Sequence, residues 1–362
     1  MVDLYKTLEN FMSVPAVTGF EEQRRQRIVE TFKPYCQEID IDVMGNVIGT
    51  VGEGDRNVLL AGHYDQLGFM IKYVDKDGFA SFSQVGGWDK RVAYGTRLKV
   101  WIGEGPEDYI IGNIAVKPAH LTDSKERDKT PELKDMKIDL GATSKEDAEG
   151  WGVKPGTVCT PASGLDRLGK GGDLIIAPAF DDVCCVAAFV ETMEQLQDNP
   201  LNGLKVHFVA TVQEEVGLRG ATIAAYNLNP WAAIATDVTH AVAPDIKPGE
   251  VGGIELGKGP VISLGANFTR ALWEIMEKQA EKNSIPYQRQ GVPSRSGTDA
   301  WAIQIERGGT ITGLISMPNR YMHSPNEVIH MKDLENLASL LTHTLHGLDE
   351  SEIKHNKRVH SK

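Results

Sequence analysis

Two adjacent glutamates, Glu214 and Glu215, follow one residue after a largely apolar, β-branched run at positions 204–212. A short run of this kind, bounded by glycines, predicts a buried strand. Two negative charges at the end of a buried strand are costly unless a cation or a proton compensates them. Because open α/β sheets bind ligands at the carboxyl ends of their strands, the pair indicates a catalytic or metal-binding edge. The alternative is a solvated turn with two surface glutamates.

Histidine and acidic residues also occupy the ends of other predicted strands. They are His63 and Asp65, Asp181 and Asp182, Asp237, and His323. Singly, each has an ordinary explanation, such as a hydrogen-bonded structural histidine or an aspartate that caps the next helix. Strand ends of one sheet converge in space, and mixed histidine and carboxylate ligands suit zinc, cobalt or manganese. Together, these residues predict a metal centre.

Residue spacing predicts which of these side chains share a face of their strand. His63 and Asp65 are two positions apart, so they point to the same side of an extended chain. Asp65 can therefore lie behind His63 and hold its ring. If the strand is still extended at Glu214 and Glu215, these two side chains point to opposite sides, so one of them can bind a metal while the other faces the substrate as a base.

The pattern of the chain predicts an α/β domain that is interrupted by an all-β insertion. Residues 66–163 show short alternating stretches separated by glycine-rich turns, which is typical of a small β-barrel or sandwich. Residues 1–65 and 164–362 alternate between helices and strands, which favours a mixed central sheet flanked by helices. The expected helices cover residues 21–33, 182–197, 267–283, 299–305 and 332–346. The expected strands cover residues 38–43, 47–51, 57–63, 204–212, 231–237 and 310–316, with another near Tyr287.

Composition and the absence of several motifs exclude some classes of protein. The chain of 362 residues carries a net charge of −12, which argues against nucleic acid or an anionic membrane as its main partner. It has no signal segment, no run of about 18 apolar residues and no paired-cysteine zinc motif, so we expect a cytoplasmic protein. It also lacks the HExxH, GxSxG, Walker A and GxGxxG motifs, which argues against thermolysin-like enzymes, serine hydrolases, P-loop proteins and Rossmann dehydrogenases.

Five ordered motifs resemble those of the tetrahedral aminopeptidases. These are cocatalytic two-metal peptidases that include glutamyl aminopeptidases and proteins once labelled cellulase M. The motifs are Gly62-His-Tyr-Asp65, Phe180-Asp-Asp182, Val212-Gln-Glu-Glu-Val-Gly-Leu-Arg-Gly-Ala221, Ser296-Gly-Thr-Asp-Ala300 and Arg320-Tyr-Met-His-Ser-Pro325. The resemblance implies hydrolysis of N-terminal residues from peptides with a free N-terminus. It also implies a zinc-peptidase-like domain at residues 1–65 and 164–362, a β-barrel-like dimerisation domain at 66–163, and dimers that assemble into a tetrahedral dodecamer.

The resemblance further implies two divalent ions, zinc or cobalt, in each subunit. The implied ligands are Asp181 to both ions, His63 and Asp237 to one ion, and Glu215 and His323 to the other. Glu214 would be the general base that activates a bridging water, and Asp65 would orient and polarise His63. The family also has a cis peptide bond after the bridging aspartate.

One segment departs from the family pattern. Where Asp-Asp-Arg is expected, this chain continues from Asp182 with Val183, Cys184 and Cys185. The change removes a predicted ion pair but no predicted ligand, so we expect activity to be retained. The two thiols would bind a soft metal only adventitiously.

Two other functions stay open at this point. Adjacent glutamates suggest a glycosidase, but glycoside hydrolysis uses two carboxylates about 5–9 Å apart and has no use for metal ligands. A non-catalytic assembly protein that retains the fold is the second alternative.

The sequence also predicts which loops surround the substrate and how the segment around His323 is held. We expect loops at residues 252–265 and 291–299 to surround the first side chain of the substrate. Arg295 there would favour acidic side chains, face solvent or contact a neighbouring subunit. Residues 324–327 form a Ser-Pro-Asn-Glu sequence that predicts a helix start with a capping box, which would fix the backbone that presents His323.

Overall fold

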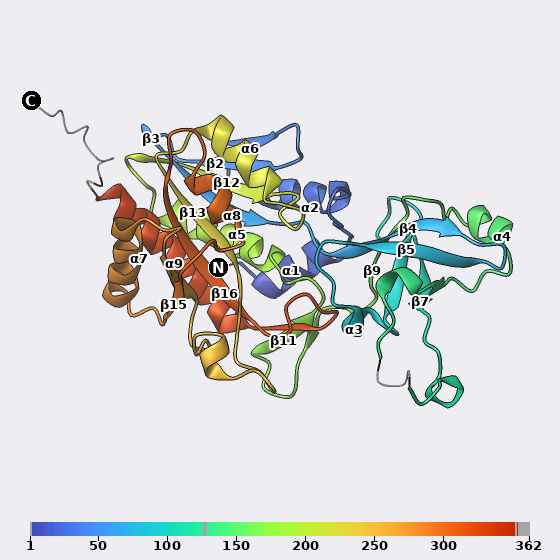
Figure 1. Cartoon of the computed structure of the whole chain (residues 1–362). Coiled ribbons are helices and arrows are strands. Elements are labelled where there is room, and N and C mark those ends of the chain that lie inside the picture. The colour runs from blue at the N-terminus through green and yellow to red at the C-terminus, as the bar shows by residue number, and fades with distance from the viewer. Residues whose placement is uncertain (1, 126–128, 352, 354–362) are drawn as a thin grey trace, which may run out of the picture.

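An eight-stranded mixed sheet forms the centre of the larger part of the molecule, on the left of Figure 1. The computed structural model describes residues 2–125, 129–351 and 353. The strand order is β1-β2-β12-β3-β13-β16-β14-β15. The bounds are β1 Glu38–Ile41, β2 Val47–Val51, β3 Arg56–His63, β12 Leu204–Thr211, β13 Ala232–His240, β14 Val261–Gly265, β15 Gln288–Val292 and β16 Ile311–Asn319. Strands β12, β3, β13 and β16 are parallel, so their carboxyl ends lie at one edge.

Helices cover both faces of this sheet, and the strand sequences explain why. Val58 and Leu60 of β3 belong to the largest core cluster, whereas Leu59 and Ala61 belong to a cluster on the opposite face. Alternate residues of a strand point to opposite faces, so the uninterrupted apolar run Val58–Ala61 needs cover on both. The first face carries α1 Leu4–Met12, α2 Glu22–Phe32, α5 Val183–Asp198, α7 Arg270–Lys282 and α9 Met331–Asp349, and the second carries α6 Arg219–Leu228 and α8 Asp299–Gln304.

A closed six-stranded antiparallel barrel projects from the sheet part, on the right of Figure 1. Its strands are β4 Gly68–Val74, β5 Phe79–Val85, β6 Arg97–Trp101, β7 Tyr109–Ile114, β8 Ile138–Asp139 and β9 Val158–Pro161, and it carries the short helices α3 Lys90–Ala93 and α4 Lys145–Gly150. Phe69 stacks on Trp88 and meets the edge of Phe82, so the barrel has its own aromatic core. The fold class predicted from the sequence is therefore confirmed.

A small three-stranded sheet lies between the central sheet and the barrel in the folded molecule. It consists of β10 Asp166–Arg167, β11 Leu174–Ala177 and β17 Glu327–His330. The helix start predicted at residues 324–327 is wrong, because Glu327 begins β17, which pairs with β11. The final helix begins only at Met331, where the His330 side chain accepts a hydrogen bond from the Lys332 N–H.

Two further differences between the predicted and the observed elements concern the N-terminal part of the chain. Helix α1 was not predicted, although its apolar residues face the core. The strand expected at residues 38–43 ends at Ile41. The reason is Asp42, whose carboxylate accepts hydrogen bonds from the N–H groups of Met44, Gly45 and Asn46 and so folds the chain into a turn.

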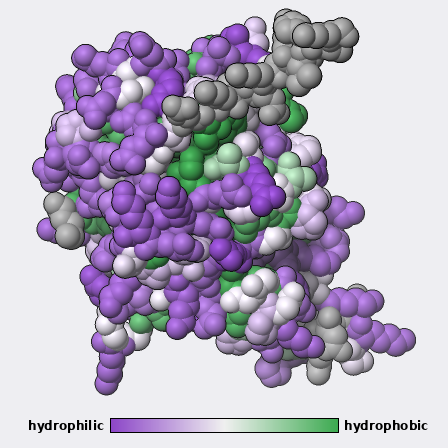
Figure 2. Space-filling view, turned by 90° about the vertical axis from the view of Figure 1, so that its left-hand side faces the viewer, coloured by the Kyte–Doolittle hydropathy of each residue, from purple (hydrophilic) through white to green (hydrophobic). Residues whose placement is uncertain are grey.

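The surface is largely hydrophilic on the side shown in Figure 2, where hydrophobic residues are confined to small areas. Within the described parts of the chain, the structure has no helix of the length and apolar character that a membrane span requires.

Candidate metal centre

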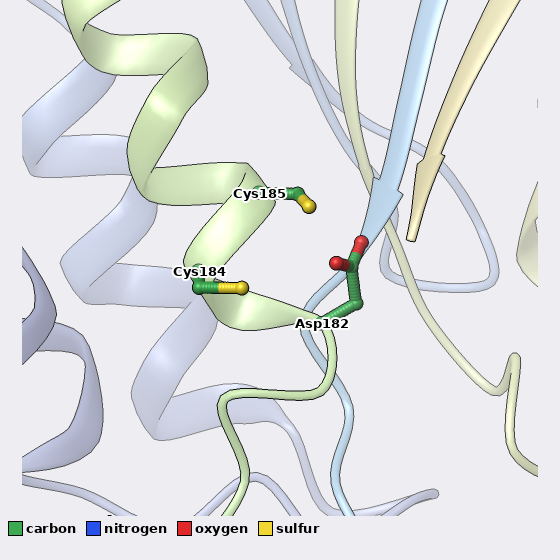
Figure 3. Close-up of side chains that lie close together, drawn as sticks. All are labelled: Asp182, Cys184 and Cys185. Atoms are coloured by element: carbon green, nitrogen blue, oxygen red, sulfur yellow. The ribbon is translucent and has the colours of Figure 1, made fainter. Parts of the chain in front are cut away.

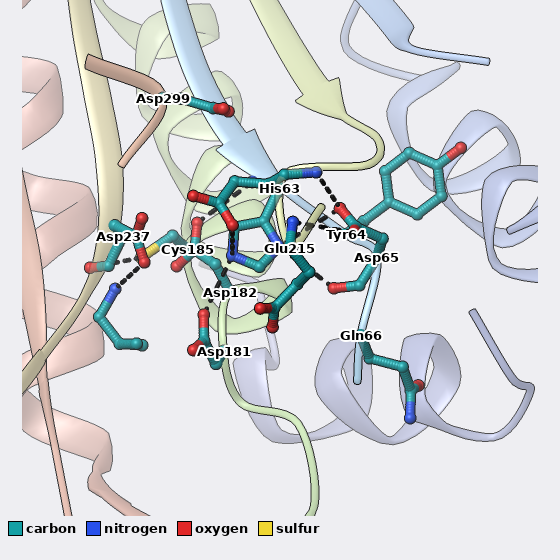
Figure 4. Close-up of polar contacts among 12 residues, drawn as sticks. His63, Tyr64, Asp65, Gln66, Asp181, Asp182, Cys185, Glu215, Asp237 and Asp299 are labelled. Atoms are coloured by element: carbon teal, nitrogen blue, oxygen red, sulfur yellow. Dashed lines mark hydrogen bonds and ion pairs between the residues drawn. The ribbon is translucent and has the colours of Figure 1, made fainter. Parts of the chain in front are cut away.

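The residues that the sequence predicts for the metal centre come from separate segments of the chain. His63 is the last residue of β3, Asp237 lies near the end of β13, and Glu214 follows β12. Asp181 precedes α5, and His323 lies in the turn between β16 and β17. Because the strands concerned are parallel, their ends meet at one edge of the sheet, as Figure 4 shows for most of these side chains.

Asp181 lies between the two histidines. Its Oδ1 is 3.0 Å from His63 Nε2, and its Oδ2 is 3.2 Å from His323 Nε2. Glu215 Oε2 lies 3.7 Å from the same His323 nitrogen, and Glu214 Oε2 lies 3.9 Å from His63 Nε2. The two glutamates thus face different histidines, although the chain is no longer extended there: β12 ends at Thr211, and Gln213 has a φ of 56°.

Asp237 lies close to His63, as predicted. Asp182, which is not among the predicted ligands, lies close to both of them. Donor atoms of His63, Asp182 and Asp237 lie within 4.8 Å of one another, as do those of His63, Asp181 and Glu215. Asp182 Oδ2 also accepts a hydrogen bond of 3.2 Å from the His63 N–H. The peptide bond between Asp181 and Asp182 is cis.

The cluster holds more buried carboxylates than its two imidazoles can neutralise. Burial and the nearby Asp181 raise the pKa of Asp237 to about 8. Burial also raises the pKa values of Glu214 and Glu215 well above the usual range. Burial alone would lower the pKa of His323, but its contacts with Asp181 and Glu215 raise it to about 9. The protein alone therefore leaves this edge short of positive charge.

The donor set fits divalent cations. Glu215 Oε1 is buried and has no hydrogen-bond partner among the described residues. Buried acceptors without a partner are rare, and a cation would satisfy them. Imidazole nitrogens and carboxylate oxygens are the ligands that zinc and cobalt accept.

Asp65 connects the ends of β3 and β12. Its Oδ1 accepts a hydrogen bond of 3.1 Å from the Glu214 N–H, and its Oδ2 accepts bonds from the Glu215 N–H at 3.4 Å and the Thr18 hydroxyl at 2.8 Å. The His63 ring presents Nδ1 to the backbone carbonyl of Asp65 at 3.1 Å, while the carboxylate lies 3.5 Å away. Asp65 therefore orients His63 through its backbone as much as through its side chain.

We expect Asp65→Asn to lower kcat/KM about 10- to 100-fold, the usual effect of changing a partner of a metal ligand. The side-chain amide introduced by this substitution would place its own N–H group opposite a backbone N–H donor. Leaving these buried donors without an acceptor costs about 1–3 kcal/mol of stability. Kinetics on an aminoacyl-p-nitroanilide and thermal unfolding measure the two effects. Asp75→Asn is a matched control, because the half-buried Asp75 carboxylate accepts the N–H groups of Asp77 and Phe79 in the barrel and pairs with Lys137 there. Wild-type kinetics in Asp65→Asn would contradict the role of Asp65.

Sequence reasoning missed two buried residues beside the centre. Arg24 donates hydrogen bonds to the backbone carbonyls of Phe11, Val14 and Tyr64. Burial lowers the pKa of Arg24 to about 10, against the opposing effect of the Asp65 charge. Its position four residues before Ile28 on the buried face of α2 was the available signal. The other residue is Glu327. The sequence predicts that it caps a helix, whereas in the structure its carboxylate accepts hydrogen bonds from the Asp181 and His323 N–H groups.

Cys184 and Cys185 lie at the start of α5, next to Asp182 (Figure 3). Donor atoms of these three residues are within 4.8 Å of one another, and all three residues are buried. Burial raises the pKa of Cys185 well above its usual value, which opposes formation of the thiolate that binds soft metals. The thiols therefore pack as small apolar groups.

A pocket of about 740 Å³ opens beside the carboxylate cluster. Its walls come from the ends of β13 and β16, from β15, and from residues 293–298. The loop at residues 252–265 contributes no lining residue, so that part of the expected pocket is wrong. Arg295 is the only lysine or arginine among the described lining residues, and its side chain is exposed.

Comparisons with known proteins agree with this arrangement. The sequence model of the M42 glutamyl aminopeptidase family matches residues 45–340. The lysyl aminopeptidase of Pyrococcus furiosus is 34% identical over 354 residues, covering 96% of this chain and 99% of that protein. A TET aminopeptidase from the marine sediment archaeon Thaumarchaeota archaeon SCGC AB-539-E09 is 32% identical, with a TM-score of 0.88 and coverage of 95% and 98%. The TET1 peptidase of Pyrococcus horikoshii is 34% identical, with a TM-score of 0.82 and coverage of 94% and 98%.

These matches span nearly the whole chain, and they favour neither a glycoside hydrolase nor a non-catalytic assembly protein. M42 peptidases depend on metal ions, and the donor set described above suits such ions. The chain belongs to the M42 family and is an aminopeptidase, a hydrolase that removes residues from the N-terminus of peptides.

Proposed function

We propose that this aminopeptidase binds two divalent ions, zinc or cobalt, at the carboxyl edge of its sheet. The proposed ligands are Asp181 to both ions, His63 and Asp237 to one, and Glu215 and His323 to the other. The observation that carries the proposal is the position of Asp181, with one carboxylate oxygen 3.0 Å from His63 Nε2 and the other 3.2 Å from His323 Nε2. A carboxylate placed in this way can share its two oxygens between two ions.

Glu214 is the proposed general base and Asp65 the proposed orienting residue. When bound, the ions would acidify a water molecule and polarise the scissile carbonyl group. Glu214 is buried and lines the substrate pocket, so it can take a proton from the water and pass it to the leaving amine. Burial raises its pKa well above that of a free glutamate, which suits a group that must both accept and release a proton. Asp65 keeps Glu214 in place through the hydrogen bond to its N–H.

A chelator should abolish hydrolysis of aminoacyl-p-nitroanilides, and added zinc or cobalt should restore it. The reason is that, without the ions, neither the attacking water nor the scissile carbonyl group would be activated. Rates are measured before chelation, after chelation and after each metal is added back. A soluble cellulose serves as the control substrate and should not be cleaved in any of these states. Chelator-resistant cleavage of the cellulose would contradict the peptidase mechanism.

We also propose that residues 66–163 form a dimerisation domain and that residues 1–65 and 164–362 form the catalytic domain. The Pyrococcus horikoshii relative can assemble into a tetrahedron or a large octahedral shell, which supports a homo-oligomer here, and we propose that dimers assemble into a tetrahedral dodecamer. Among the described residues of 66–163, six large aromatic or aliphatic side chains are exposed, as an interface would require: Tyr73, Phe79, Ile111, Val116, Leu121 and Trp151. A cytoplasmic location and peptide substrates with a free N-terminus complete the proposal.

A further inference from the structure

Glu327 joins the two segments that carry Asp181 and His323. Only 2% of its surface is exposed. Its Oε2 accepts a hydrogen bond of 3.0 Å from the Asp181 N–H, and its Oε1 accepts one of 3.0 Å from the His323 N–H. The side-chain amide of Asn319 donates a third bond, of 3.1 Å, to Oε2. One buried carboxylate therefore holds the backbone of both proposed ligands.

The small three-stranded sheet explains how Glu327 reaches both segments. Glu327 pairs with Ala177 at the end of β11, four residues before Asp181. On its other side, a bridge between Arg320 and Val328 closes the turn that contains His323. The carboxylate is thus fixed at the point where the two ligand-bearing segments meet.

The backbone of His323 needs such a partner. His323 has a φ of 61°, in the left-handed region that residues with side chains rarely adopt. Its N–H bond to Glu327 holds this conformation and keeps His323 Nε2 3.2 Å from Asp181 Oδ2. Without an acceptor at this position, the turn can relax and the two groups separate.

We propose that Glu327 is a positioning residue that sets the separation of Asp181 and His323 and so determines how tightly that half of the centre binds its cation. The inference rests on the proposed two-ion centre. Glu327 does not line the substrate pocket, so it acts through the two residues that it holds and not through the substrate.

Glu327→Gln tests this role with little change in shape. Glutamine has one oxygen, and its amide group would face a backbone N–H that now donates to a carboxylate. We expect the dissociation constant of the ion bound by His323 to rise about 10- to 100-fold, as for other partners of metal ligands. Isothermal titration of the metal-free protein with zinc, and the visible spectrum of the cobalt form, measure this change. Excess metal should restore kcat, which a general loss of structure would not allow.

Two further variants complete the test. Glu327→Asp keeps both oxygens on a shorter side chain, so the shift in metal affinity should be smaller than in Glu327→Gln. Asp333→Asn is the matched control, because the buried Asp333 carboxylate accepts the N–H groups of Gly257 and Gly259 and contacts neither ligand segment. It should bind metal as the wild type does.

The outcomes separate the two proposals. Wild-type metal affinity in Glu327→Gln, or an equal loss in Asp333→Asn, would overturn the positioning role and leave the two-ion centre intact. A wild-type protein that takes up no divalent ion would overturn the centre and the role of Glu327 together.

Discussion

Glu214→Gln should lower kcat about 10²- to 10⁴-fold, the usual contribution of a general base, and should leave the metal content unchanged. Glutamine has nearly the same shape as glutamate but cannot take a proton from water. Its backbone N–H would keep the bond to Asp65, so the local structure should persist. Single-turnover kinetics with an aminoacyl-p-nitroanilide and metal analysis by mass spectrometry give both quantities.

Glu215→Gln is the natural comparison, because it changes the adjacent carboxylate in the same way. Glu215 Oε2 lies 3.7 Å from His323 Nε2, so this variant should weaken the metal site that includes His323. Added metal should then recover part of its activity. If Glu214→Gln instead lost metal and regained its rate on reconstitution, the roles of the two glutamates would be reversed.

Asp181→Asn should abolish activity and strip both ions from the protein. Asp181 is the only one of the described carboxylates within 4 Å of both His63 Nε2 and His323 Nε2. Charge stabilisation by metal ions is worth several kcal/mol, and each 1.4 kcal/mol is a tenfold change in rate, so we expect a loss of about 10³-fold or more. Metal analysis after dialysis against a weak chelator, together with kinetics, measures the effect.

Asp182→Asn provides the control on the neighbouring residue. Burial and the nearby Asp237 raise the pKa of Asp182 well above its usual value, so a neutral amide is a close substitute. This variant should keep most of its metal. Retention of both ions in Asp181→Asn with their loss in Asp182→Asn would show that Asp182, which lies with His63 and Asp237, is the shared ligand instead.

Much of the candidate site could be predicted because local pattern and general topology determine it. His63 ends β3 and Glu214 follows β12; these two strands are mostly apolar and lie side by side in parallel, so their ends meet at one edge of the sheet. The different roles predicted for Glu214 and Glu215 relied on the alternation of side chains along an extended chain, whereas in the structure β12 ends at Thr211 and the chain turns at Gln213, which has a φ of 56°.

Other parts depend on contacts between distant segments, which no local pattern reveals. Residues 324–327 have the composition of a helix start, yet pairing with β11 makes Glu327 the first residue of a strand. The bonds of its carboxylate to Asp181 and His323 follow from that pairing. The hydrogen bonds from Glu214 and Glu215 to Asp65 likewise depend on how closely two strand ends approach.

The position of the barrel within the sheet sequence has a consequence for folding. Strand β3 ends at His63, but its partners β12 and β13 are synthesised only after the whole barrel, and β16 later still. Contacts between segments so far apart in the chain form slowly, because a long loop must close first. We therefore expect that a growing chain cannot assemble even half of its metal centre early. We expect activity only after the segment that carries His323 has been synthesised, because this residue lies in the turn after β16.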